Sequence, residues 1–343
     1  MSIFILAFAV TILNTMPIWL AELAFKSGGS EVAVGLLASA VLVSAALGCL
    51  FGSSAMRPLL LRSAGGVVCG GLAGAAIAQT IAPPVLFAGA CVVGLLQGIV
   101  LALSLSRKHS EAAMLRMIGN GIAIGCVTSF VLLAGTFAAG LPILPLLAAL
   151  AGAQALLLQQ QPPPLPGNGN TQRLDWARDL ILLPFFICMG AYWTFLEIFA
   201  AEQELGGLSG WLAASLLLSA IGSFLAGATP DRITSHARIA GLLLAGFAGC
   251  LTYLSQTEML LGASILINAF GLFLFFPLYL DRTDAPAAGM ARYLLGFALG
   301  GGAGSLAIAL GGYPALGVTV AASGLIALPA LRRSRPKPDV PRS

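Results

Sequence analysis

Apolar runs of about 20 residues follow one another along almost the whole chain, separated by short polar breaks. A helix of that length crosses the hydrocarbon core of a bilayer. The pattern predicts about twelve such helices, and we expect the first to be retained because it lacks the basic start of a signal peptide. The predicted helices lie at 3–24, 32–53, 63–82, 84–105, 117–138 and 141–158, and then at 180–200, 206–228, 238–255, 258–280, 290–310 and 313–331.

The amino-acid composition excludes an ordinary water-soluble protein. Of the 343 residues, 58% are hydrophobic and 9% are charged, whereas charged residues make up about 25% of soluble domains. Helices of about 20 residues use up most of the chain, so the loops are too short to hold a soluble domain. We therefore expect an all-α polytopic membrane protein whose chemistry takes place within the bilayer.

The basic residues indicate an orientation. If both ends of the chain are cytoplasmic, every Lys and Arg of the 17 except Lys26 falls on the cytoplasmic side. Cytoplasmic loops of membrane proteins carry such an excess of positive charge. We expect a multi-pass protein of the cell inner membrane. Anionic lipid headgroups beside the membrane are enough to explain its basic C-terminal tail, so no nucleic-acid partner is expected.

The two halves of the chain are similar and are separated by a polar segment. Residues 159–172 read QQQPPPLPGNGNTQ, a composition that favours a linker. A shift of 175 residues aligns 35–57 with 210–232 and also places Glu22 on Glu197. Because each half has an even number of helices, the repeat is parallel. The predicted domains are an N-terminal six-helix bundle at 1–158, a cytoplasmic linker at 159–177, a C-terminal six-helix bundle at 178–331 and a disordered basic tail at 332–343.

A basic turn follows the second predicted helix of each half. From Gly227 to Arg232 it reads Gly-Ala-Thr-Pro-Asp-Arg, and from Gly52 to Arg57 it reads Gly-Ser-Ser-Ala-Met-Arg. With six plus six helices and a cytoplasmic middle linker, this motif resembles that of the major facilitator superfamily, over essentially the whole chain. The resemblance implies two parallel six-helix repeats around a central cavity and transport by alternating access.

The resemblance also implies a cytoplasmic gate built from charges. Asp231 would pair with Arg282, at the end of the tenth helix, when the cytoplasmic face is closed. The predicted gate residues are Asp231, Arg232, Arg282, Arg57 and Arg107. In the alternative interpretation, these side chains are solvated loop charges that set the topology.

Candidate substrate and coupling residues lie on the helices that line the cavity in this family. Glu22 and Glu197 are carboxylates inside predicted helices, where lipid disfavours a charge unless it has a function. The residues that share a helix face with these glutamates are Thr15, Trp19, Trp193 and Thr194. Carboxylates and indoles around one path could hold an amphipathic cation or carry a coupling proton. In the alternative interpretation, both glutamates reach headgroup water at the outer interface.

Four uncharged polar residues complete the candidate set, namely Gln97, Asn268, Asn14 and Tyr192. Each could contact substrate or only form a hydrogen bond with a neighbouring helix. Glycine-rich stretches at 119–125 and 300–304 are interpreted as surfaces for close helix packing, because no Lys-Ser/Thr follows as in a phosphate loop.

The favoured function is secondary active transport of a small organic molecule, coupled to protons and preferring export. An uptake permease or uniporter of the same fold is one alternative, and a membrane-embedded enzyme or non-transporting sensor is another. His109 and His236 lie in predicted loops, and the six cysteines lie in apolar runs without a CxxC pair. No catalytic set, metal site or cofactor is therefore expected. The expected partners are a small-molecule substrate, a coupling proton and the lipid bilayer, and the protein is expected to be a monomer.

Overall fold

The computed structural model describes residues 2–28, 31–52, 58–105, 111–160, 176–283 and 285–332. Within these ranges all regular structure is helical. The helices are α1 (Ser2–Asn14), α2 (Met16–Lys26), α3 (Glu31–Phe51), α4 (Pro58–Ile77), α5 (Pro83–Leu105), α6 (Glu111–Ala139), α7 (Ile143–Gln159), α8 (Trp176–Glu202), α9 (Leu208–Ala228), α10 (Thr234–Tyr253), α11 (Glu258–Asp281) and α12 (Pro286–Arg332). Eight of them are long and apolar enough to cross a membrane, or nine if α1 and α2 count as one bent span.

The first predicted helix is present but broken at Thr15. Its two parts, α1 and α2, meet at an angle of 48°. Pro17 has no N–H group with which to donate to the Leu13 carbonyl, so the regular helical ladder cannot continue through this point. The indole nitrogen of Trp19 donates to the carbonyl of Ile12 at 3.0 Å. A side chain therefore stabilises the backbone at the bend.

The last two predicted helices are joined in α12. Gly311 and Gly312 depart from helical geometry, and the φ of Gly312 is 70°, in the left-handed region that favours glycine. The sequence places its only break between these helices at the same point. α12 therefore supplies two consecutive spans, while α4 and α7 contain the shorter apolar helices Ser63–Ile77 and Ile143–Gln159.

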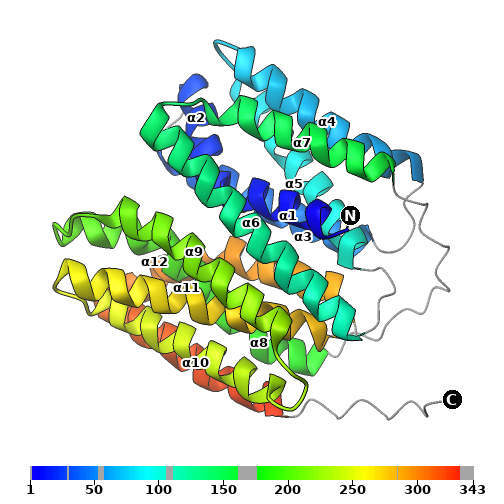
Figure 1. The fold of residues 1–343 in the computed structure, drawn as a ribbon. Coiled ribbons are helices and arrows are strands. Elements are labelled where there is room, and N and C mark those ends of the chain that lie inside the picture. Colours follow the sequence, from blue (N-terminus) through cyan, green and yellow to red (C-terminus); the bar gives the residue numbers. More distant parts are fainter. Residues whose placement is uncertain are drawn as a thin grey trace, which may run out of the picture.

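The helices form two groups, named here the N-terminal half (α1–α7) and the C-terminal half (α8–α12) (Figure 1). The starts of α1 and α8 and the end of α12 lie at the same end of the molecule. The halves meet along a junction where α6 contacts α9 and α3 contacts α12. The domain boundaries drawn from the linker remain a prediction, since residues 161–175 and 333–343 lie outside the described ranges.

Glycines allow close packing at equivalent places in the two halves. A Cβ at Gly121 or Gly125 of α6 would lie within 3 Å of Leu6 or Val10 of α1. A Cβ at Gly296 or Gly300 of α12 would overlap α8 in the same way. These pairs of glycines are related by the shift of 175 residues that aligns Glu22 with Glu197. The glycines thus fit the predicted packing role. The repeat also relates the contact between α6 and α1 to the contact between α12 and α8.

The helices of the two halves approach closely where α6 crosses α9. A Cβ at Gly119 of α6 would lie 2.6 Å from the carbonyl oxygen of Ser223 and 2.7 Å from the Cα of Gly227, both on α9. Further along the junction, the hydroxyl of Ser39 in α3 donates to the carbonyl of Ala298 in α12 at 3.3 Å. The crossing at Gly119 lies close to the end of α9 that carries the predicted gate motif.

Candidate functional site

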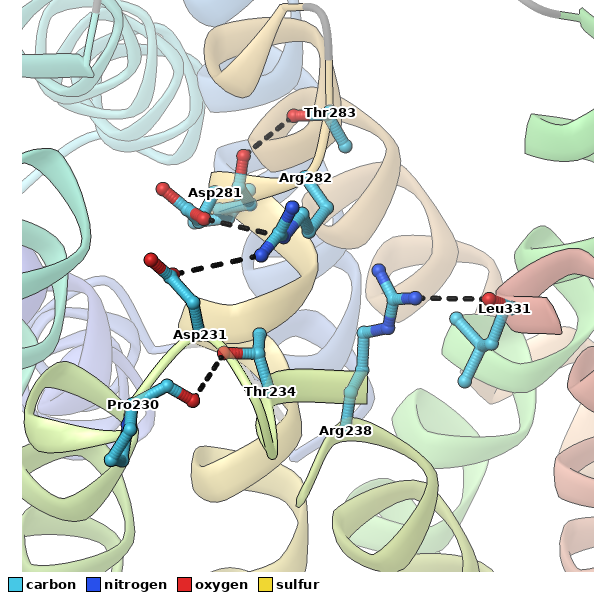
Figure 2. Close-up of polar contacts among 9 residues, drawn as sticks. Pro230, Asp231, Thr234, Arg238, Asp281, Arg282, Thr283 and Leu331 are labelled. Atoms are coloured by element: carbon cyan, nitrogen blue, oxygen red, sulfur yellow. Dashed lines mark hydrogen bonds and ion pairs between the residues drawn. The ribbon is translucent and has the colours of Figure 1, made fainter. Parts of the chain in front are cut away.

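A cluster of charges lies where α9, α10 and α11 end or begin (Figure 2). The guanidinium of Arg282 lies 3.8 Å from a carboxylate oxygen of Asp231 and 3.7 Å from one of Asp281. The Asp231 side chain is 92% exposed, whereas that of Asp281 is 8% exposed. Arg282 therefore links a solvated acid on the α9–α10 loop to a buried acid at the end of α11. The gate role of this pair remains a prediction.

The remaining predicted gate residues are not part of this contact. Arg232 is exposed beside Asp231, and Arg57 and Arg107 lie outside the described residues. Sequence reasoning did not select Arg238, which is buried and donates to the carbonyl of Leu331 at 2.9 Å, joining α10 to α12 (Figure 2). Its position in the basic run after Asp231 was a usable signal, as was the place of Asp281 directly before Arg282.

On the first span, Glu22 is engaged in an ion pair. Its carboxylate lies 3.7 Å from the ammonium of Lys26, one turn along α2. The same ammonium donates to the carbonyls of Ala75 and Ala76, at the end of α4. Lys26 therefore links α2 to α4, and Glu22 contacts the same ammonium from within α2. The Glu22 side chain remains 32% exposed.

Two further candidates on the first span, Thr15 and Trp19, form hydrogen bonds with its backbone. Thr15 is fully buried, and its hydroxyl donates to the Thr11 carbonyl at 2.9 Å. Trp19 is 1% exposed and donates to Ile12. Trp19 thus has no exposed ring face for a cation in this conformation, in contrast to the cation–π role expected from the sequence. The burial of the ring follows from its use as a donor at the bend.

On α8 the corresponding residues are more accessible. Thr194 and Glu197 are exposed, and Trp193 is half-buried. The Thr194 hydroxyl donates to the Gly190 carbonyl at 2.8 Å. The rings of Trp193 and Tyr192 meet edge to face with centroids 5.1 Å apart. The two glutamates therefore have different surroundings, and Glu197 has the more exposed side chain.

The candidate residue of α5 forms hydrogen bonds with a neighbouring helix. Gln97 is fully buried, and its amide exchanges hydrogen bonds of 3.1 and 3.3 Å with the amide of Gln154 in α7. Gln154 also donates to the carbonyl of Ile5 in α1 at 3.2 Å. Of the two roles left open for Gln97, the structure shows helix-to-helix bonding. Sequence reasoning missed Gln154, although it is a polar residue in an apolar run just as Gln97 is.

The polar residues of the C-terminal half likewise lie between helices. Asn268 of α11 is fully buried and donates to the Ala245 carbonyl of α10 at 2.7 Å. Tyr192 is also buried, and its hydroxyl lies 3.2 Å from that of Thr252, which in turn lies 2.9 Å from that of Ser264. These contacts join α8, α10 and α11.

The amide groups of Asn14 and Asn268 differ in their remaining contacts. Asn14 in α1 is half-buried and donates weakly to the sulfur of Cys126 in α6 at 3.6 Å. The side-chain oxygen of Asn268 is buried and has no hydrogen-bond partner among the described residues. Such an oxygen can accept a hydrogen bond from water or a ligand.

Comparisons with known proteins identify the fold of this chain. No protein-family model matches the chain, and no curated protein matches it. The structure is similar to the crystal structure of the human organic anion transporter MFSD10 (TETRAN), with 15% identity over 96% of this chain and 97% of that one, and a TM-score of 0.72. It is also similar to the major facilitator transporter FucP in the outward conformation, with 14% identity over 98% and 100% of the chains and a TM-score of 0.69. The chain has the major facilitator fold.

A variant of the Escherichia coli fucose:proton symporter FucP matches equally well, with 14% identity, 98% and 97% coverage and a TM-score of 0.69. At these identities the likeness establishes the fold alone. In the major facilitator fold, α1 and α2 together form the first span, and α12 forms the last two. The resemblance inferred from the sequence is therefore confirmed for fold, and the chain is a multi-pass membrane protein.

Proposed function

We propose that this chain is a secondary active transporter that moves a small organic molecule by alternating access. The observation that carries the proposal is the junction of the two halves. They touch closely at the Gly119 crossing beside the charge cluster, and the contact relies on the absence of a side chain. A contact of this kind can open without breaking a network of strong bonds, as rocking of one half against the other requires.

Proton coupling is the proposed source of energy. Glu197 is exposed on α8, and Glu22 is partly exposed beside Lys26. A carboxylate that solvent can reach from one side is able to take up a proton there and release it elsewhere after the halves have moved. The fucose:proton symporter of the same fold is coupled to protons, as its name states. Export remains the preferred direction, and an uptake permease or uniporter remains the alternative.

Counterflow in proteoliposomes tests the proposal. Vesicles containing the purified protein are loaded with one unlabelled compound from a panel of organic anions, sugars and amphipathic cations, and the same compound is then added outside in labelled form. Transient accumulation of label for at least one compound is expected, and an imposed pH gradient should alter its extent. A protein that binds a compound without any counterflow would be a sensor, and a protein that converts it would be an enzyme.

The proposed orientation has both ends of the chain in the cytoplasm, in the inner membrane. Single cysteines at Gly169 and Gln203 test it in intact cells. Each is introduced into a protein whose native cysteines have been replaced. An impermeant thiol reagent should label Gln203→Cys, in the α8–α9 loop, and should spare Gly169→Cys until the membrane is permeabilised. Equal labelling of both in intact cells would contradict the orientation.

A further inference from the structure

A groove lies at the junction of the two halves, between residues 123–128 of α6 and residues 220–225 of α9. Its volume is about 400 Å³, and it is open along its outer side. Each half contributes one wall. The shape of the groove therefore depends on how the halves are placed relative to each other.

The groove opens away from the protein interior. Two residues along a helix correspond to a turn of about 200°, so Val127 lies almost opposite Gly125, which packs on α1. In the same way, Phe224 lies almost opposite Gly222, which packs on Phe270 of α11. Val127 is 43% exposed and Phe224 is 57% exposed. Both walls therefore turn their accessible side outward, on helices that cross the membrane.

The lining of the groove suits a purely apolar ligand. Its floor includes Ala123 and Ala220, each only 7% exposed, and their small side chains give the groove its depth. Seven of the eight lining residues are apolar, and the exception, Thr128, already donates its hydroxyl to the Ile124 carbonyl at 2.8 Å. The groove therefore offers no free donor to a polar ligand, and affinity has to come from apolar area alone.

We propose that this groove binds one acyl chain of a bilayer phospholipid. The groove lies partway along the two spans Ala113–Ala139 and Leu208–Ala228, where the surrounding medium is hydrocarbon. A flexible acyl chain can follow a concave surface between two helices, and the hydrocarbon around these spans consists of such chains. The chain is a ligand that contacts both halves at once.

Contact with both halves couples the lipid to conformation. A ligand that binds one arrangement of two moving parts better than another shifts the population toward the first. An acyl chain in this groove therefore favours the present arrangement, in which α6 and α9 are closed at Gly119. The lipid site itself does not depend on the proposed transport function. Only the effect of the lipid on the arrangement of the halves rests on that function.

Photolabelling locates the acyl chain. The purified protein is placed in phosphatidylcholine vesicles that contain a small fraction of phospholipid with a diazirine midway along one acyl chain. After illumination, labelled peptides are quantified by mass spectrometry. Peptides covering 123–128 and 220–225 should carry several-fold more label than the peptide with Leu306 and Leu310, two residues of α12 that are 63% and 79% exposed.

Filling the groove provides the decisive variant. Ala123→Leu combined with Ala220→Leu should abolish the excess label at 123–128 and 220–225 while labelling of α12 stays unchanged, which also shows that the protein is folded. Ala73→Leu, on the exposed side of α4, is the matched control and should keep the excess. Equal labelling of all exposed faces, or excess label that persists in the filled variant, would overturn the proposal. Disulfide cross-linking of two copies that carry Val127→Cys in a cysteine-free background would identify a second protomer as the occupant and would also overturn it.

Discussion

Gly119 of α6 and Gly227 of α9 touch across the junction of the halves, and the contact is asymmetric. A Cβ on Gly119 would lie 2.7 Å from the Cα of Gly227, closer than real Cβ atoms approach. A Cβ on Gly227 would lie 3.4 Å from the Cα of Gly119, which is an ordinary contact. The same pair of glycines therefore supplies a disruptive substitution and its own control.

Gly119→Ala should open the junction beside the charge cluster. Overpacking typically costs about 1–3 kcal/mol, and because the clash lies between the halves, separating them relieves it. A change of that size shifts a two-state equilibrium by about 5–150-fold. The distance between spin labels on Arg116→Cys and Thr229→Cys, measured in a cysteine-free background, should become longer. Gly227→Ala should leave the distance distribution unchanged, and an equal response to both substitutions would refute the role of this crossing.

Asp231→Asn should reduce transport while the amount of protein in the membrane stays normal. The pair with Arg282 is 3.8 Å long and its acid is 92% exposed, so its contribution to folding stability is small. The charge matters only if the closed arrangement needs it. Initial counterflow rates, normalised to protein level, provide the measurement. Asp231→Glu should retain most of the rate, and an unchanged rate in Asp231→Asn would return this residue to the role of a solvated loop charge.

At least one of Glu22→Gln and Glu197→Gln should abolish uphill transport and its pH dependence. Glutamine keeps the size and the hydrogen bonding of glutamate but cannot be titrated. Downhill exchange should survive, because alternating access needs no net proton movement. Accumulation and exchange are measured in the same vesicles with and without a pH gradient. Lys26→Met is the comparison for Glu22, since it removes the ion partner and two bonds to α4 but leaves the carboxylate, and pH-dependent accumulation should survive in it. Normal accumulation in both glutamine variants would assign coupling to another ion or to none.

Gln97→Leu should destabilise the N-terminal half more than its double mutant with Gln154→Leu does. The single change leaves the buried Gln154 amide without its partner on α5, at a cost of about 1–3 kcal/mol. The double mutant removes both amides, although the Ile5 carbonyl then loses its donor. Thermal unfolding in detergent compares the two. A double mutant less stable than either single mutant would show that the amides act independently.

The sequence predicted the spans well because apolar length is a direct physical requirement of the bilayer. Each predicted helix has a counterpart, and the break before the last one falls at Gly311 and Gly312. The bend in the first span was not predicted, although Pro17 was visible. Proline is common in membrane helices, and whether it breaks one depends on donors such as Trp19, which only the fold brings into place.

The candidate site was less accessible to sequence reasoning, because partners come from distant helices. The Asp231 and Arg282 contact followed from the resemblance and the repeat. The partner of Gln97, by contrast, lies 57 residues away at Gln154, and no local pattern connects them. The repeat placed Glu22 and Glu197 at matching positions but could not show that Lys26 engages only the first.

The indole of Trp19 is also a fluorophore located at the bend of the first span. The chain has four tryptophans, and the other three can be replaced by phenylalanine to leave this one as the sole emitter. Its ring is 1% exposed and bound to the Ile12 carbonyl, so its emission reports on the geometry of the bend itself. Straightening of the span during a transport cycle would hydrate the ring and shift its emission to longer wavelength. The protein thus carries an intrinsic optical probe, with no attached dye, of whether its first span flexes or stays rigid as the halves move.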